Sequence, residues 1–184
     1  MSTPAERILA AADKLFYGQG IRAVGVDTVA AEAGVSKRTL YNHYPSKDAL
    51  IAAYLTARFK HIAPSDKPAR EQLLGAFDRL ERMLADGSFR GCPYVNAVTE
   101  IGDPKHAAAR IALQFKEQRR LWYRALLERL GVGDPDALAT QLQILAEGVL
   151  AAGIVRGDPA VARSARAAAE VLLNAASTRR RKKE

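Results

Sequence analysis

Cations and aromatic hydrogen-bond donors alternate in residues 35–47, VSKRTLYNHYPSK. Lys37, Arg38 and Lys47 carry positive charge, and Tyr41 and His43 can donate hydrogen bonds beside them. Side chains of these types contact phosphates and base edges, so the stretch predicts a surface that binds nucleic acid. The solvated face of an ordinary helix is the alternative, and it is the better interpretation for a cluster of charges alone.

The surrounding residues predict how this stretch is positioned. Within residues 27–44, DTVAAEAGVSKRTLYNHY, a short helix ends at Ala33-Gly34, where glycine can take a left-handed turn, and Ser36 caps a second helix. Two helices joined by so short a turn cross steeply, which is the helix-turn-helix arrangement. Leu40 is expected to face the core, so the second helix can enter a major groove. The glycine turn, the cap and the spacing together favour this interpretation over a solvated face.

The outward face of the second helix holds side chains that can read bases. Lys37 and Arg38 can reach guanine acceptors or phosphates, and Asn42 can pair with adenine. Thr39 can touch a thymine methyl group. With Ser36 at the helix start, these residues are the candidate base-contacting group.

A second group is expected to hold the DNA backbone. Tyr41 and His43 suit phosphate contacts, which position a protein on DNA without reading its sequence. Ser46 is expected to cap a further helix with Lys47 in its first turn. Free amides and partial positive charge at a helix start attract phosphate, so Lys47 adds another clamp.

Helix punctuation runs through the whole chain. Thr3-Pro4, Asp103-Pro104, Asp134-Pro135 and Asp158-Pro159 each place a capping side chain before a proline, a pattern typical of helix starts. Apolar residues follow helical rather than alternating spacing, and strand signals are absent. The sequence predicts an all-α protein of about nine helices, at roughly 4–19, 27–33, 37–43, 46–62, 68–86, 94–102, 104–130, 135–156 and 159–177.

Composition favours a protein of the cytoplasm that binds polyanions. The 184 residues carry a formal net charge of +8, and 48% are apolar, which suffices for a buried core without disulfides. Cys92 is the single cysteine, which fits a reducing compartment. The N-terminus lacks the pattern of a signal peptide, and no run of about 20 uncharged apolar residues predicts a membrane span.

The stretch from about Ala5 to Leu50, above all AAEAGVSKRTLYNHYPSKDAL, closely resembles the DNA-binding region of the TetR family of bacterial transcriptional regulators. The resemblance implies an N-terminal helix-turn-helix that binds DNA as a dimer, followed by a divergent helical region with a ligand pocket and a dimer interface. It also implies base or backbone contacts for Lys37 and Thr39, phosphate contacts for Tyr41, His43 and Lys47, and a backbone contact for Thr28.

Two residues depart from the family pattern. Asp27 is an acid where some relatives carry a cation. Tyr44 replaces the commoner phenylalanine and adds a hydroxyl that must reach water or a partner.

The predicted domains are residues 1–47 for DNA binding, including the start of the connecting helix, 48–178 for ligand binding and dimerisation, and a disordered basic tail at 179–184.

By the same resemblance, the C-terminal region should enclose a small-molecule pocket. Its aromatic content suits a hydrophobic or planar ligand, and polar residues within its apolar helical segments could orient that ligand. The candidate residues are Phe77, Leu80, Met83, Leu84, Phe89, Tyr94, Asn96, Glu100, Phe115, Trp122, Tyr123 and Glu147. For any single apolar or aromatic residue of this set, plain core packing is the better interpretation, and an exposed face explains the three polar ones equally well.

The last two predicted helices are rich in alanine, which allows two helices to approach closely. A contact between two copies of the chain would bury their apolar stripes and give the homodimer that a helix-turn-helix needs for two half-sites. Leu142, Leu145, Val149, Val171 and Leu172 are the candidate interface residues.

Cys92 lies in a glycine-broken segment just before Pro93. A thiol at a helix start has a lowered pKa, so Cys92 is a candidate sensor of oxidants or electrophiles, although a lone cysteine is more often a small buried apolar residue. The three histidines share no metal-ligand spacing with it, so neither a metal nor another cofactor is predicted.

The resemblance to the TetR family implies a repressor that a small hydrophobic or aromatic ligand releases from a palindromic operator. A small all-α enzyme using the C-terminal cavity is one alternative, but the chain shows no Ser/His/Asp order, no paired carboxylates and no phosphate-binding glycine loop. A non-specific nucleic-acid binder acting through the RRRKK tail is another. A non-specific binder of this kind gives no account of VSKRTLYNHYPSK, so an operator in double-stranded DNA is the expected partner. No catalytic residues are predicted.

Overall fold

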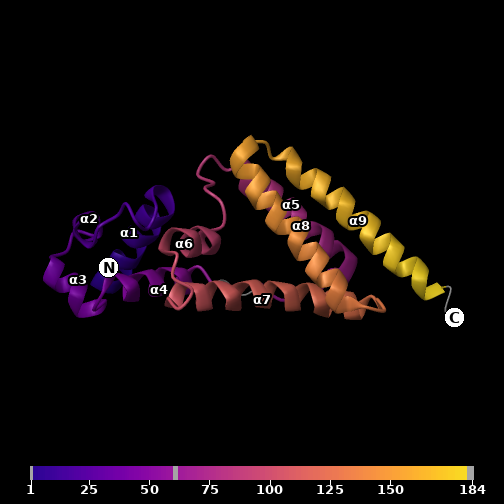
Figure 1. Ribbon diagram of the computed structural model, residues 1–184, viewed down its shortest axis with the longest axis horizontal. Coiled ribbons are helices and arrows are strands. Elements are labelled where there is room, and N and C mark those ends of the chain that lie inside the picture. The colour runs from indigo at the N-terminus through magenta and orange to yellow at the C-terminus, as the bar shows by residue number, and fades with distance from the viewer. Residues whose placement is uncertain (1, 60–61, 182–184) are drawn as a thin grey trace. The chain divides into compact units, whose positions relative to one another are not determined.

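The computed structural model describes residues 2–59 and 62–181, and its regular structure there is helical throughout (Figure 1). The prediction of an all-α protein is confirmed. Within these ranges the helices are α1 (Pro4–Gln19), α2 (Val26–Glu32), α3 (Lys37–His43), α4 (Lys47–Ala57), α5 (Ala69–Ala85), α6 (Pro93–Ile101), α7 (Ala107–Arg129), α8 (Pro135–Arg156) and α9 (Ala160–Arg181).

Local side-chain caps begin several of these helices. Thr3 Oγ1 accepts from the Glu6 amide at 3.2 Å, and Glu6 Oε2 accepts from the Thr3 amide at 2.8 Å, which completes a capping box before α1. Asp134 Oδ1 accepts from the Ala137 amide at 3.1 Å and caps α8. These contacts are local in sequence, which is why the starts of α1 and α8 were predictable.

Several predicted helix ends differ from the structure. Asp103-Pro104 begins a turn instead of α7, because Asp103 Oδ1 accepts from the Lys105 amide at 2.9 Å. His106 Nδ1 then accepts from the Ala108 amide at 3.0 Å, and α7 begins at Ala107. In addition, α4 ends at Ala57 rather than near residue 62, and α9 begins at Ala160 and extends to Arg181.

The chain divides into two compact units. Unit 1 comprises residues 1–61 and 92–115, and unit 2 comprises residues 62–91 and 116–184. The helix α7 contributes its first part to unit 1 and the remainder to unit 2. Unit 1 therefore joins the N-terminal helices to α6, a segment that is distant in sequence. The boundary at residue 47 stays a prediction.

Unit 1 is built around α1, which packs against α2, α3 and α4. Ile8 and Phe16 of α1 are buried in its core together with Leu40 of α3 and Leu50 of α4. The Phe16 ring meets the Tyr54 ring edge to face, with 5.7 Å between centroids. The short α2 and α3 thus rest on α1, which holds the helix-turn-helix in place.

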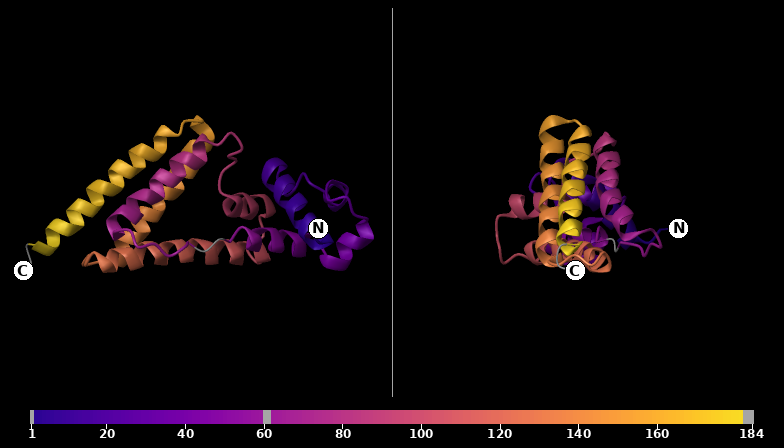
Figure 2. Two further views of the ribbon diagram at one scale, coloured as in Figure 1. Left: turned by 180° about the vertical axis from the view of Figure 1, so that it is seen from behind. Right: turned by 90° about the vertical axis from the view of Figure 1, so that its right-hand side faces the viewer.

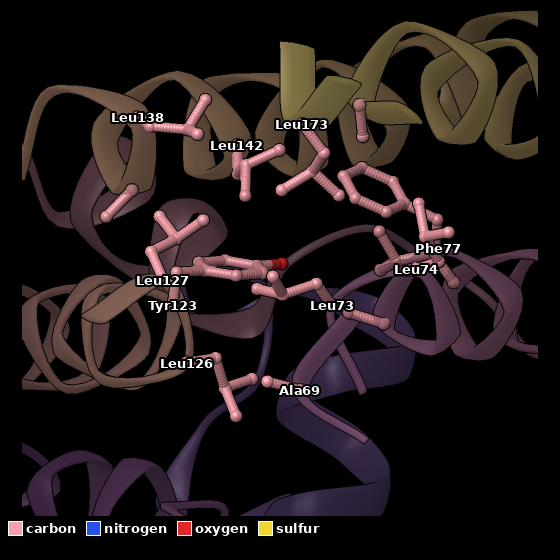
Figure 3. Packing of buried hydrophobic residues seen from close by; sticks show 14 of the residues in the cluster. Ala69, Leu73, Leu74, Phe77, Tyr123, Leu126, Leu127, Leu138, Leu142 and Leu173 are labelled. Atoms are coloured by element: carbon pink, nitrogen blue, oxygen red, sulfur yellow. The ribbon is translucent and has the colours of Figure 1, made fainter. Parts of the chain in front are cut away.

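Unit 2 is a helical layer in which α5, α8 and α9 pack side by side (Figures 1 and 2). Tyr123 and Leu127 of α7 complete its core against Leu73 of α5, Leu142 of α8 and Leu173 of α9 (Figure 3). All five side chains are buried. Burial of this apolar cluster is the main contribution to the stability of unit 2.

The helix α8 is long and apolar enough to span a membrane by length and composition, with a mean hydropathy of 1.5 in its most apolar window. Core helices of other proteins pass the same test. Here Leu138, Leu142 and Val149 belong to the core cluster of unit 2, so an apolar α8 has a role in packing.

The predicted disordered tail at 179–184 falls partly on α9 and partly on residues 182–184, which lie outside the described residues. The prediction of disorder stays untested.

Candidate nucleic-acid interface

The turn between α2 and α3 has the geometry that a helix-turn-helix requires. Gly34 takes a left-handed conformation with φ +62°, and its amide donates to the carbonyl of Ala31. The Val35 amide donates to the carbonyl of Ala30, which closes the turn. Ser36 Oγ then accepts from the Thr39 amide at 3.0 Å and caps α3.

The predicted outward residues of α3 are exposed together. Lys37, Arg38, Tyr41, Asn42 and His43 are all solvent accessible, whereas Leu40 between them is fully buried. Thr39 is half-buried, and its hydroxyl lies 2.8 Å from the Ser36 hydroxyl. One face of α3 therefore packs inward while the other presents cations, an amide and aromatic hydrogen-bond donors.

Asp27 lies against this face and engages its first cation. Lys37 Nζ donates to Asp27 Oδ2 at 3.1 Å and lies 2.9 Å from Oδ1, and this hydrogen bond raises the pKa of the Lys37 ammonium group. Both side chains are exposed, so water and salt weaken the pair. Lys37 would have to leave Asp27 to contact a phosphate or a guanine.

The start of α4 continues the basic surface. Ser46 Oγ accepts from the Ala49 amide at 3.0 Å, so Lys47 is the first residue of a capped helix, as predicted. Tyr44 has its partner in the backbone, because its hydroxyl donates to the carbonyl of Ala5 at 3.3 Å. Burial raises the pKa of the Tyr44 hydroxyl, and the hydrogen bond to Ala5 links the end of α3 to α1.

Two contacts that support unit 1 were not predicted from the sequence. Arg58, at the end of α4, binds both carboxylate oxygens of Asp13 in α1, with Nη2 2.9 Å from Oδ2. Its guanidinium also lies 4.2 Å from the centroid of the Tyr17 ring. Asp13 and Arg58 are 45 residues apart, so no local spacing could have paired them.

The helix α6 is attached to the helix-turn-helix region through Glu100. Glu100 Oε2 accepts a hydrogen bond from the Arg22 amide at 3.0 Å, in the loop between α1 and α2. His106 Nε2 lies 3.4 Å from Asp48 Oδ1 in the first turn of α4. Glu100 was predicted to orient a ligand, and in the structure its carboxylate already has a protein partner within unit 1.

The residues predicted to line one ligand pocket are divided between the two units. Tyr94 and Phe115 belong to unit 1, where their rings stack with 4.0 Å between centroids and the Tyr94 hydroxyl donates to the carbonyl of Leu55. Asn96 and Glu100 belong to unit 1 as well, whereas Phe77, Leu80, Met83, Leu84, Phe89, Trp122, Tyr123 and Glu147 belong to unit 2.

Within unit 2, most of the predicted pocket residues have packing or pairing roles. Phe77, Leu80 and Tyr123 are buried in the core cluster, and Glu147 forms an ion pair with Lys116. A cavity of about 330 Å³ is lined by Trp122 alone of the predicted set. Its other lining residues are Ile62, Ala63, Ser65, Lys67, Glu71, Gln72, Gly75, Asp78, Arg79 and Arg82. The charged residues among them were not predicted to line a pocket. The ligand role of the predicted set stays a prediction.

The candidate dimer residues also separate by burial. Leu142 and Val149 are buried within unit 2 itself, and Leu145 and Leu172 are half-buried. Val171 is 67% exposed and lies on the outer side of α9. Leu142 and Val149 therefore contribute to the core of one chain, and the sequence pattern could not distinguish an inward from an outward leucine on an apolar helix.

Cys92 is buried at the position just before α6, which favours the interpretation as a small packed residue. Its role as a sensor stays a prediction. Among residues 2–59 and 62–181, no group of three or more His, Cys, Asp or Glu side chains is arranged to hold a metal ion. His61, one of the three histidines, lies outside the described residues.

The fold and the exposed face of α3 define a helix-turn-helix regulator of transcription. Residues 8–54 match the sequence profile of "Bacterial regulatory proteins, tetR family". A TetR transcriptional regulator from Streptomyces avermitilis is 34% identical, with a TM-score of 0.82 over 95% of this chain and 98% of that one. A TetR-family regulator from Streptomyces coelicolor is 32% identical with the same TM-score, over 95% and 96% of the two chains.

A relative in Escherichia coli, the "HTH-type transcriptional regulator YjdC", is 28% identical over 95% of each chain. The chain belongs to the TetR family of bacterial regulatory proteins, whose members are DNA-binding transcriptional regulators. The family expected from the residues around VSKRTLYNHYPSK is thereby confirmed.

Proposed function

We propose that the protein is a repressor that binds a palindromic operator as a homodimer in the cytoplasm and is released by a small molecule. The exposed face of α3 carries this proposal, because Lys37, Arg38 and Asn42 project from a helix whose opposite side is anchored by buried Leu40. These three side chains have donors that match guanine and adenine in the major groove. Thr39 adds a methyl group that can contact thymine.

The residues proposed to contact the DNA backbone lie around the exposed face of α3. Tyr41 and His43 are exposed on α3, Thr28 is exposed on α2, and Lys47 begins α4. Phosphates on either side of the groove would meet these groups, which set register and orientation rather than sequence preference. Residues 1–47 would then form the DNA-binding domain, with residues 48–178 serving ligand binding and dimerisation.

The homodimer is proposed to form on the outer faces of α8 and α9. Ile144, Ala151 and Val155 are exposed on α8 at helical spacing, and Ala168 and Val171 are exposed on α9 at helical spacing. Two copies would bury these stripes against each other in an isologous contact. A dimer also supplies two α3 helices for half-sites about 34 Å apart.

Repression is the direction of control that we propose. One relative, 26% identical over 72% of this chain, is the "HTH-type transcriptional repressor KstR2". Another, 34% identical over 43% of this chain, is the "HTH-type transcriptional activator FasR". A ligand would cause release by binding more tightly to the form of the dimer that fits DNA poorly.

Selection of bound sequences from a random pool of duplex DNA tests the DNA-binding proposal. We expect the parent protein to enrich a palindrome and the Tyr41→Ala, Lys47→Ala double variant to enrich none. Lys105→Ala is the matched control, because it removes an exposed lysine from the turn before α7. Equal enrichment by the parent and the double variant would refute the proposed role of α3 and α4.

Sedimentation of the free protein tests the dimer separately. Val171→Asp places a charge on the outer side of α9, and we expect it to give a monomer at micromolar concentration. Leu113→Asp is the control, because Leu113 is 69% exposed and belongs to unit 1, whereas α8 and α9 belong to unit 2. A dimer that survives Val171→Asp, or one that both variants disrupt, would contradict the proposed interface.

A further inference from the structure

Arg79 and Arg82 line the cavity of about 330 Å³ in unit 2 without a carboxylate partner among the described residues. The other charged groups around this cavity are already paired. Lys67 Nζ lies 2.6 Å from Glu71 Oε1, and Asp78 Oδ1 lies 3.0 Å from Arg166 Nε. Because these charges are already paired, the guanidinium groups of Arg79 and Arg82 are the cations of this cavity that can bind an anion.

The surroundings make this positive charge costly without a counter-ion. Partial burial lowers the pKa of the Arg79 guanidinium, and the nearby charges of Arg119 and Arg82 lower it further, while Tyr123 and Asp78 act in the opposite direction. Arg79 and Arg82 remain solvent-exposed, so water screens part of the repulsion between the like charges. An anion bound at Arg79 would offset that repulsion, so the cavity favours negatively charged occupants.

Trp122 provides the flat apolar surface of the same cavity. The Arg79 guanidinium carbon lies 5.7 Å from the centroid of the Trp122 ring. Ile62 and Ala63 add further apolar wall, and Gly75 adds no side chain of its own. A planar guanidinium can bind a carboxylate through two parallel hydrogen bonds, while an aromatic ring of the ligand packs on the indole.

We propose that this cavity binds a small aromatic carboxylate, which is the releasing effector of the regulator. The effector role rests on the proposed function, whereas the binding itself does not. A volume of about 330 Å³ is at the lower end of the range for small-molecule sites, roughly 300–1,000 Å³, and suits a ligand of one or two rings. The carboxylate would pair with Arg79 and Arg82, and the ring would contact Trp122.

Binding can be located directly because Trp122 is the single tryptophan of the chain. Its indole N–H gives one side-chain signal in a proton–nitrogen correlation spectrum, which can be followed during titration of the full-length protein. The probes are benzoate, benzamide and inorganic phosphate. Benzamide has the shape of benzoate without its charge, and phosphate has charge without a ring.

We expect benzoate to shift the Trp122 signal in a saturable manner and to bind at least about tenfold more tightly than benzamide, since hydrogen bonds to charged groups are worth that much. Benzoate should also bind more tightly than phosphate, because phosphate has no ring to pack on Trp122. Arg79→Gln should weaken benzoate binding about tenfold or more, by the same reasoning. Arg156→Gln, which removes an exposed arginine at the end of α8, is the matched control and should leave binding unchanged.

The inference is overturned if no probe shifts the Trp122 signal, if benzamide or phosphate binds as well as benzoate, or if the two variants behave alike. The effector role is tested by adding benzoate to the complex of the parent protein with its selected operator. Release from the operator by the parent and not by Arg79→Gln supports it, and retention of the operator at saturating benzoate refutes it. Failure to select any operator would count against the proposed function and not against the carboxylate site.

Discussion

Gly153 allows α8 to approach α5 more closely than any other residue would. It is buried, and a Cβ built on its backbone would lie 2.5 Å from Cδ2 and 2.8 Å from Cγ of Leu84. Carbon atoms in contact are normally about 3.5–4.0 Å apart, so Leu84 would have to move by roughly 1 Å in Gly153→Ala. The variant therefore tests the packing of α5 on α8 with the smallest available change.

The expected free-energy change combines two opposing effects. Extra methyl groups in a packed core typically cost about 1–3 kcal/mol, whereas alanine in place of glycine within a helix contributes about 1 kcal/mol. Because Leu84 is half-buried and can rotate in part, we expect a net loss of about 1 kcal/mol in the free energy of unfolding. Gly75→Ala in α5 is the control, since the nearest atom to its Cβ is Arg79 Nη1 at 4.0 Å. That control should gain about 1 kcal/mol.

Urea denaturation at one fixed protein concentration measures both changes, because the stability of a dimer depends on concentration. The Gly153→Ala, Leu84→Ala double variant should lose less than the sum of its single variants, since Leu84→Ala removes the clash. If Gly153→Ala is as stable as Gly75→Ala, or if the double variant is additive, the close contact between α5 and α8 is wrong.

Three further variants test the helix-turn-helix and its attachments. Ser36→Ala removes the cap that the Thr39 amide uses, so denaturation should show a loss of about 1 kcal/mol, and an unchanged midpoint would contradict that role. Glu100→Ala removes the acceptor of the Arg22 amide, and hydrogen exchange of that amide should become faster, whereas Glu100→Gln keeps an acceptor oxygen and should change it little. Asp27→Asn removes an acidic group beside Lys37, so binding to the selected operator should tighten several-fold at low salt, and weaker binding would show that Asp27 assists recognition.

The features that were predictable from the sequence depend on neighbouring residues. The cap of α3 joins Ser36 to Thr39, three residues apart, and the turn before it needs only a glycine at position 34. Exposure of Lys37 and Arg38 follows from the helical period once Leu40 is placed in the core. Each of these interactions forms within one or two turns of helix, so the identity of a few consecutive residues specifies it.

Some helix ends were not predictable even though their residues are adjacent. Asp103 before Pro104 has the composition of a cap, yet it closes a turn, and His106 provides the nitrogen that begins α7. An aspartate before proline suits either structure, and packing of the flanking segments selects one. Burial likewise selects which leucines of α8 face inward, because Leu142 and Leu145 have the same apolar character in the sequence.

The sequence by itself determined the all-α class, the order of the helices and the exposed face of α3. Only the tertiary structure decided that Glu100 holds the Arg22 amide across 78 residues and that Asp13 pairs with Arg58. It also decided that Trp122 shares a cavity with Arg79. Contacts of this kind depend on how whole helices pack, and packing is set by the burial of many side chains at once rather than by the spacing of a few.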